Sequence, residues 1–249
     1  MDWMGWMGWM GRMGKREERD GAANRVRPEH PARSACPARP APPARPALPA
    51  LLLICLAISC SAPKPPDDRD YATRIAADRA AKDQAFMAGD DPIPKAKHGE
   101  FLPLAYYPVD PEFNVPAELK RIDDPTIIEM PTSTGTNRKM RRVGTLHFTL
   151  KGQPLSLLAF IELGETSSLF VAFSDLTSGA ETYAAGRFLD INRNATGLYE
   201  LDFNRAYFPY CFYNPTYECP LPPRENRLKI PIHAGERMHK SQLSSAKSQ

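Results

Sequence analysis

Residues 141–163 read RRVGTLHFTLKGQPLSLLAFIEL and carry the clearest structural pattern in the chain. In the first half, the apolar residues Leu146, Phe148 and Leu150 alternate with less apolar ones. A Lys-Gly pair follows, and residues 155–163 then have apolar side chains on both faces. Because side chains alternate between the faces of a strand, the pattern predicts two antiparallel strands joined by a tight turn. The second strand is expected to be covered on both sides.

Similar short runs rich in Val, Ile, Leu, Phe and Thr flank this hairpin, separated by Pro, Gly, Asp or Asn. They occupy residues 113–123, 126–132, 168–173, 187–191, 197–203 and 226–232. About eight strands with short links predict a mainly β (α+β) domain, built as an antiparallel β-sandwich or a partly closed β-barrel.

A helix is expected before the strands, from Asp70 to Met87, because Gly89 and Pro92 end the pattern there. Its apolar stripe is thin and rests on Tyr71 and Ile75, then on Phe86 and Met87 at the far end. We therefore expect one face of this helix to pack alongside the β domain.

Composition divides the chain near residue 66. Residues 1–66 carry ten Lys and Arg against five Asp and Glu, with eleven of the 26 prolines, whereas residues 67–249 carry 22 against 24. The positive charge thus belongs to the N-terminal segment, and the near-neutral body argues against a nucleic-acid partner. Residues 1–46 are expected to be disordered and of low complexity, 70–238 to form a single domain, and 239–249 to be a disordered tail.

An export segment is expected at residues 47–60, ALPALLLICLAISC, where arginines precede a short apolar run. The run is shorter than the roughly 20 residues of a membrane-spanning helix. Ala57-Ile58-Ser59-Cys60 resembles a lipobox, although Ala57 stands where Leu is usual. This predicts a lipoprotein acylated at Cys60, with residues 61–69 as a Pro-rich tether. The domain would be membrane-anchored in the bacterial envelope and face the periplasm; soluble export and an uncleaved anchor are the alternatives.

Polar residues then recur in blocks: FSDLTSGAETY at 173–183, GRFLD at 186–190, LDFNRAY at 201–207, and CPLPP with Glu225-Asn226 from 219 onward. These blocks, with YYPVDPEFNVPAEL at 106–119, resemble the family of bacterial and archaeal proteins called domain of unknown function 1684. The likeness spans roughly residues 70–238. It implies no established activity.

Six residues in or beside these blocks are candidates for a ligand site, namely Glu181, Tyr183, Arg187, Asp202, Asn204 and Tyr207. One interpretation is a structural ion-pair network, because an arginine between carboxylates fixes adjacent turns. The other is a pocket in which Arg187 binds a carboxylate or phosphate while Glu181 or Asp202 acts as a base.

The aromatic and proline-rich segment at 203–223 contains two cysteines, Cys211 and Cys219. In an oxidising compartment we expect them to form a disulfide, with buried free thiols or metal ligation as alternatives. Its seven aromatic residues between Phe203 and Tyr217 are interpreted as a cover over a barrel end, or else as a binding surface.

Two hypotheses for function follow. The first is a non-enzymatic domain that binds a small molecule or an envelope component. The second is an enzyme, for example a hydrolase, that uses Glu181, Arg187 and Asp202. The histidines lack metal-site spacing, and phosphate-binding and dinucleotide motifs are absent. The sequence thus predicts no metal and no cofactor.

Overall fold

The computed structural model describes residues 68–89, 91–124, 126–164 and 168–246. The predicted N-terminal extension, the export segment with Cys60 and most of the tether lie outside these residues.

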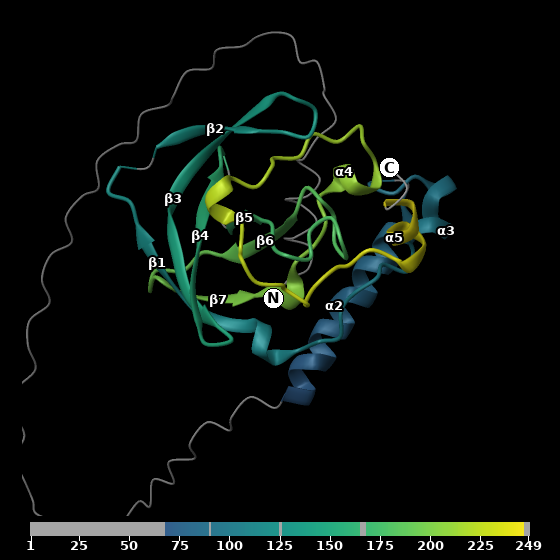
Figure 1. Cartoon of the computed structure of the whole chain (residues 1–249), viewed down its shortest axis with the longest axis horizontal. Helices are drawn as coiled ribbons and strands as arrows, with labels where there is room; N and C mark the ends of the chain where they lie inside the picture. The colour runs from purple at the N-terminus through teal and green to yellow at the C-terminus, as the bar shows by residue number, and fades with distance from the viewer. Residues whose placement is uncertain (1–67, 90, 125, 165–167, 247–249) are drawn as a thin grey trace, which may run out of the picture. The chain divides into compact units, whose positions relative to one another are not determined.

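In the described part, seven strands form one antiparallel sheet. They are β1 (Asn114–Arg121), β2 (Ile127–Pro131), β3 (Asn137–Leu150), β4 (Gln153–Glu162), β5 (Ser168–Phe173), β6 (Arg187–Asn192) and β7 (Leu198–Asp202). Their order is β6-β5-β4-β3-β1-β7, and β2 pairs with the start of β3. The sheet curls until β6 approaches β7, which gives a nearly closed barrel (Figure 1). The prediction of a mainly β antiparallel fold is confirmed in its barrel form.

The β3–β4 hairpin forms as its pattern predicts. Lys151 and Gly152 adopt φ of 50° and 75° in the two-residue turn, which suits the right-handed twist of the flanking strands. The register slips once, between Arg142 and Gly144. A side chain at Gly144 would meet the Lys120 carbonyl oxygen at 2.3 Å. The glycine therefore lets β3 bend close to β1 at this bulge.

Two apolar clusters cover the sheet. The first fills the barrel and includes Leu146, Val171 and Leu201. The second lies on the outer face of β4, β5 and β6 and includes Phe160 and Phe170. Neighbouring residues of these strands belong to different clusters, which confirms the predicted cover on both faces for residues 157–161, whereas Leu163 is exposed.

The helices lie outside the barrel. They are α2 (Asp68–Ala88), α3 (His98–Phe101), α4 (Tyr210–Tyr213) and α5 (Lys240–Ala246), with the 3-10 turns η1 (Lys95–Lys97), η2 (Pro111–Phe113), η3 (Phe203–Arg205) and η4 (Arg224–Asn226). Figure 1 shows α2 along one side of the barrel. Among the described helices, none has the length and apolar character that crossing a membrane requires.

Helix α2 confirms the predicted helix, but the residues that it buries differ in part from the predicted apolar stripe. Tyr71, Ile75 and Phe86 are buried, as expected, whereas Met87 is 54% exposed. Lys82 is buried on the same face. Because residues 75, 82 and 86 share one face of a helix, a charged group is carried into the protein between apolar neighbours.

Two predictions are wrong. Residues 226–232 form no strand; Pro231 lacks an N–H group, and the side chains of Arg187 and Asp175 bind the backbone there instead. The expected disordered tail contains α5, because Leu243 packs against the outer apolar cluster and Gln242 accepts a hydrogen bond from the His239 N–H at 2.9 Å.

Asn226 holds β4 beside β5; among the described residues, these two strands pair directly at Phe160 and Phe170 alone. Its side-chain oxygen accepts from the Leu158 N–H at 2.6 Å. Its amide nitrogen donates to the carbonyls of Leu158 at 3.0 Å and Ala172 at 2.8 Å. One side chain thus replaces the backbone hydrogen bonds missing where the strands separate.

Candidate functional site

Arg187, at the start of β6, is a fully buried cation. Its Nη2 donates to Asp175 Oδ2 at 2.9 Å and to the carbonyl of Ile232 at 2.8 Å. Its Nη1 donates to the carbonyls of Ala234 and Glu236. The guanidinium therefore fastens the irregular segment 232–236 to the barrel and has no surface to offer a ligand.

Asp175 completes this arrangement from the loop after β5. Its Oδ1 accepts from the Thr177 N–H at 2.9 Å, the Thr177 hydroxyl at 2.7 Å and the Ile232 N–H at 3.1 Å. The loop turns at Gly179, where φ is 82°. Every partner of the pair comes from the protein, which fits the structural interpretation of Arg187.

Asp202 and Asn204 belong to a different buried cluster, beneath α2. Asp202 Oδ1 accepts from the Tyr71 hydroxyl at 2.8 Å, and Asn204 exchanges hydrogen bonds with the backbone of Asp110 at 2.8 and 3.0 Å. Arg205 pairs with the other oxygen of Asp202 at 3.2 Å. Burial raises the pKa of Asp202, against the lowering effect of these hydrogen bonds.

The remaining three candidates have separate partners. Glu181 is half-exposed and accepts from the Tyr107 hydroxyl at 3.0 Å. Tyr207 is buried and donates to Asp190 at 2.6 Å. Tyr183 packs edge-on against Phe208. The structure therefore does not bring Glu181, Arg187 and Asp202 into the one cavity that the enzyme hypothesis requires.

Glu236 is a buried carboxylate that the sequence analysis missed. It pairs with the ammonium of Lys82 from α2, and its Oε2 accepts from the Phe208 N–H at 2.6 Å and the Tyr213 hydroxyl at 2.8 Å. The Lys82 ammonium also lies over the rings of Phe86 and Tyr207. The position of Lys82 on the apolar stripe of its helix was a usable clue, because a lysine there needs a buried partner.

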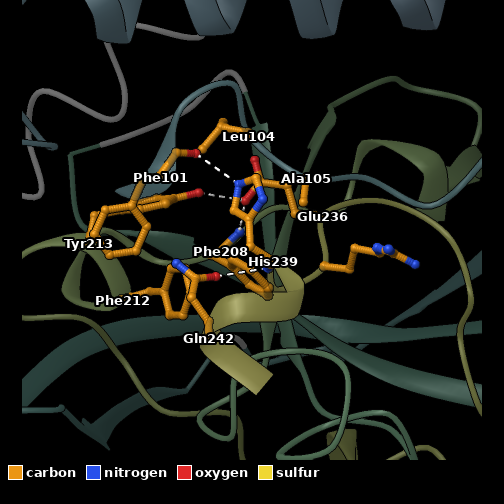
Figure 2. A pocket seen from close by; sticks show the side chains of 10 residues that line it. Phe101, Leu104, Ala105, Phe208, Phe212, Tyr213, Glu236, His239 and Gln242 are labelled. Carbon is orange, nitrogen blue, oxygen red and sulfur yellow. Dashed lines mark hydrogen bonds between the residues drawn. The ribbon is translucent and has the colours of Figure 1, made fainter. Parts of the chain in front are cut away.

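A small pocket opens beside Glu236, where the chain enters α5. Its empty space, open solvent at the mouth included, is about 180 Å³, of which the centre of a water molecule can reach about 10 Å³. It is lined by Phe101, Leu104, Ala105, Phe208, Phe212, Tyr213, Glu236, Arg237, His239 and Gln242. Figure 2 shows the His239 ring and the Gln242 amide among the aromatic side chains. His239 Nε2 is 3.2 Å from the carbonyl oxygen of Phe101. The Gln242 Nε2 is buried and has no hydrogen-bond partner within the described residues.

Residues 99–237 match the model of a protein family described as protein of unknown function, DUF1684. The chain belongs to the DUF1684 family. It is also similar to the solution NMR structure of an uncharacterized protein of Haloarcula marismortui, with 35% identity over 69% of this chain and 96% of that one, and a TM-score of 0.56. No match was found among curated proteins.

The sequence blocks that carry the resemblance to DUF1684 supply the buried network. Asp175 and Thr177 come from the first block and Arg187 from the second, and all three are buried in contact with one another or with segment 232–236. Asn204 and Asn226 from the later blocks are buried as well. In this DUF1684 domain, these blocks therefore hold the fold in place.

The proline-rich segment of the DUF1684 domain differs from expectation in one respect. Cys211 and Cys219 are free thiols, so the expected disulfide is not formed. They lie side by side, with the Cys211 N–H donating to the sulfur of Cys219 at 3.3 Å. The two cysteines thus contact each other in the reduced state. Their spacing in the sequence fits this thiol pair and a disulfide equally well, so it could not distinguish the two.

We expect Lys82→Met to destabilise the DUF1684 domain by about 3–5 kcal/mol, because the Glu236 carboxylate would stay buried without its cation. The double variant Lys82→Met/Glu236→Gln should recover part of that loss, since the uncompensated charge is gone. Chemical denaturation of the purified protein measures both.

The control for Lys82→Met is Glu112→Gln, which breaks an ion pair with Lys151 at 3.9 Å between exposed side chains. Its loss should stay below about 1 kcal/mol. Equal effects of the Lys82 and Glu112 substitutions would contradict the assigned importance of the buried pair.

Proposed function

We propose that this protein is an exported, membrane-anchored domain that binds a small molecule or the end of an envelope component in the pocket beside α5, without chemistry. The observation that carries the proposal is the buried Gln242 Nε2, which has no hydrogen-bond partner within the described residues. A buried donor without a partner costs about 1–3 kcal/mol, which a ligand acceptor would relieve.

The groups around Gln242 favour a flat ligand that carries an acceptor such as a carboxylate. Phe101, Phe208 and Phe212 supply aromatic walls, and Arg237 lines the pocket while its guanidinium lies over the ring of Tyr107. The charge of Glu236 is already paired with Lys82. The unpartnered donor of Gln242 therefore decides which ligand group is preferred.

The pocket also limits the size of the ligand. Sites for drug-sized molecules occupy about 300–1,000 Å³, whereas the space in this pocket that the centre of a water molecule can reach is about 10 Å³. That is roughly the room for one water molecule, so the terminal group of a larger molecule is the best match, with the rest of the molecule outside the pocket. This size suits recognition of an envelope component by one of its ends.

The enzyme hypothesis has less support. Arg187 is fully buried and bound by Asp175, and Asp202 is enclosed by Tyr71 and Asn204. Only Glu181 of the proposed three is accessible. A base without a neighbouring substrate-binding cation or nucleophile is a weak basis for catalysis.

The anchoring part of the proposal rests on the sequence. The lipobox-like Ala57–Cys60 precedes a short Pro-rich tether, and α2 begins at Asp68. A Pro-rich chain spans roughly 3 Å per residue, so acyl chains on Cys60 would keep the domain close to the membrane. Stable anchoring would take two or more such chains.

We expect benzoate to bind the pocket more tightly than benzylamine, because the two share one ring and only benzoate accepts a hydrogen bond from Gln242. Titration followed by NMR should shift the side-chain amide of Gln242 and the ring of His239. Gln242→Leu should weaken benzoate binding about tenfold or more.

Gln84→Leu is the matched control for Gln242→Leu, because Gln84 is exposed on α2. It should leave benzoate binding unchanged. Benzylamine binding as tightly as benzoate, or no shift at Gln242 with either compound, would contradict the pocket assignment.

For the anchor, Cys60→Ser should abolish labelling by a fatty-acid analogue in the native host and release the protein from the membrane fraction. Cys55→Ser, five residues earlier in the same apolar run, should do neither. Undiminished labelling of Cys60→Ser would refute acylation at this cysteine while leaving the pocket proposal intact.

A further inference from the structure

Cys211 and Cys219 are the two cysteines of the described domain, and the proposed function uses neither. The sulfur of Cys219 accepts the Cys211 N–H at 3.3 Å. Cys219 is fixed from β2's side of the barrel, because its N–H donates to Ser133 Oγ at 3.1 Å and its carbonyl accepts the Ser133 N–H at 2.9 Å. One thiol is therefore held in place directly against the other.

The two thiols are not equivalent. The hydrogen bond from Cys219, with further ones from Ser133 and Tyr183, lowers the pKa of Cys211 to about 7 despite its burial. The hydrogen bond to Cys211, together with burial, raises the pKa of Cys219. Cys211 is 8% exposed and Cys219 is 1% exposed. Cys211 is thus the better nucleophile and the one nearer to solvent.

We propose that Cys211 and Cys219 form a hydroperoxide-reactive dithiol, in which Cys211 attacks the peroxide and Cys219 then closes a disulfide. Hydrogen peroxide is small enough to suit the narrow access to Cys211. Cys219 needs no access from outside, because its target is the neighbouring sulfur.

In the first step, the Cys211 thiolate attacks one peroxide oxygen. The sulfur–oxygen bond forms, the oxygen–oxygen bond breaks, and hydroxide leaves with the electron pair, so that Cys211 becomes a sulfenic acid. In the second step, Cys219 loses its proton and attacks the Cys211 sulfur. The sulfur–sulfur bond forms, hydroxide leaves, and the released proton converts it to water. The dithiol loses two electrons, and the peroxide is reduced to water.

The chain between the thiols can adjust locally to this bond. Residues 212–218 connect them, and Pro215 and Thr216 are exposed at the tip. The Asn214 side chain shapes this tip by accepting from the N–H and the hydroxyl of Thr216 at 3.1 and 2.8 Å. Tyr213 and Tyr217 on either side of this tip are buried, so we expect closure to move the cysteine side chains and the exposed tip and to leave the strands in place.

The test uses the full chain with Cys36, Cys55 and Cys60 replaced by serine, so that two thiols remain. The protein is reduced, freed of reductant and treated with one equivalent of hydrogen peroxide under native conditions. Alkylation in denaturant and mass spectrometry of the peptides should then find Cys211 linked to Cys219, and dithiothreitol should reverse the link.

Two single variants assign the roles. In Cys219→Ser, oxidation should stop at a sulfenic acid on Cys211, which dimedone traps. In Cys211→Ser, Cys219 should remain an alkylatable thiol after the same treatment. The difference should disappear in urea, where both thiols are exposed.

Tyr183→Phe provides a second measurement that keeps the cysteines. It removes a hydrogen bond that lowers the pKa of Cys211, so the peroxide reaction near pH 7 should slow severalfold. Thermal unfolding establishes that each variant is folded. The proposal would be overturned if both thiols of the folded protein could still be alkylated after peroxide treatment but were oxidised in urea. It would also be overturned if the two single variants were oxidised equally.

Discussion

The buried ion pair between Arg187 and Asp175 is the constraint on which the rest of the structure depends. A guanidinium removed from water needs partners for its donors, and here both terminal nitrogens have them: one carboxylate and the carbonyls of Ile232, Ala234 and Glu236. The Nε of Arg187 is buried and has no hydrogen-bond partner within the described residues. A segment that forms no strand is thereby held across the barrel. The position of Glu236, and with it the pocket beside α5, follows from this attachment.

The Lys82–Glu236 pair extends the same arrangement to α2. Glu236 accepts a hydrogen bond from Arg187 at its backbone carbonyl. Its side-chain carboxylate pairs with Lys82 and accepts from the Phe208 N–H and the Tyr213 hydroxyl. The helix, the proline-rich segment and the barrel thus meet at a single buried carboxylate. Such a site is costly to assemble and costly to break, which suits a rigid support for the binding site proposed at its edge.

The strands of the barrel were predictable because each follows from a pattern of neighbouring residues in the sequence. The pattern of apolar residues over residues 141–163 predicts the hairpin and the burial of its second strand on both faces. The apolar stripe that includes Tyr71 and Ile75 predicts the helix. The sites were less predictable, because Arg187 meets Asp175 across 12 positions of sequence and its carbonyl partners across 45 to 49. Lys82 meets Glu236 across 154 positions. The strand expected at 226–232 failed for the same reason: side chains distant in sequence bind that backbone. Cys211 and Cys219 are close in sequence, but spacing does not report the redox state of a thiol pair.

The most direct measurement of the central claim is amide hydrogen exchange in Arg187→Met, compared with Glu112→Gln at an exposed ion pair. The account predicts about 100-fold or more faster exchange at the Ile232 and Glu236 amides in Arg187→Met. The β3–β4 hairpin should keep more of its protection, and Glu112→Gln should leave the segment unchanged. Unaltered exchange at Ile232 and Glu236 in a folded Arg187→Met protein would contradict the account.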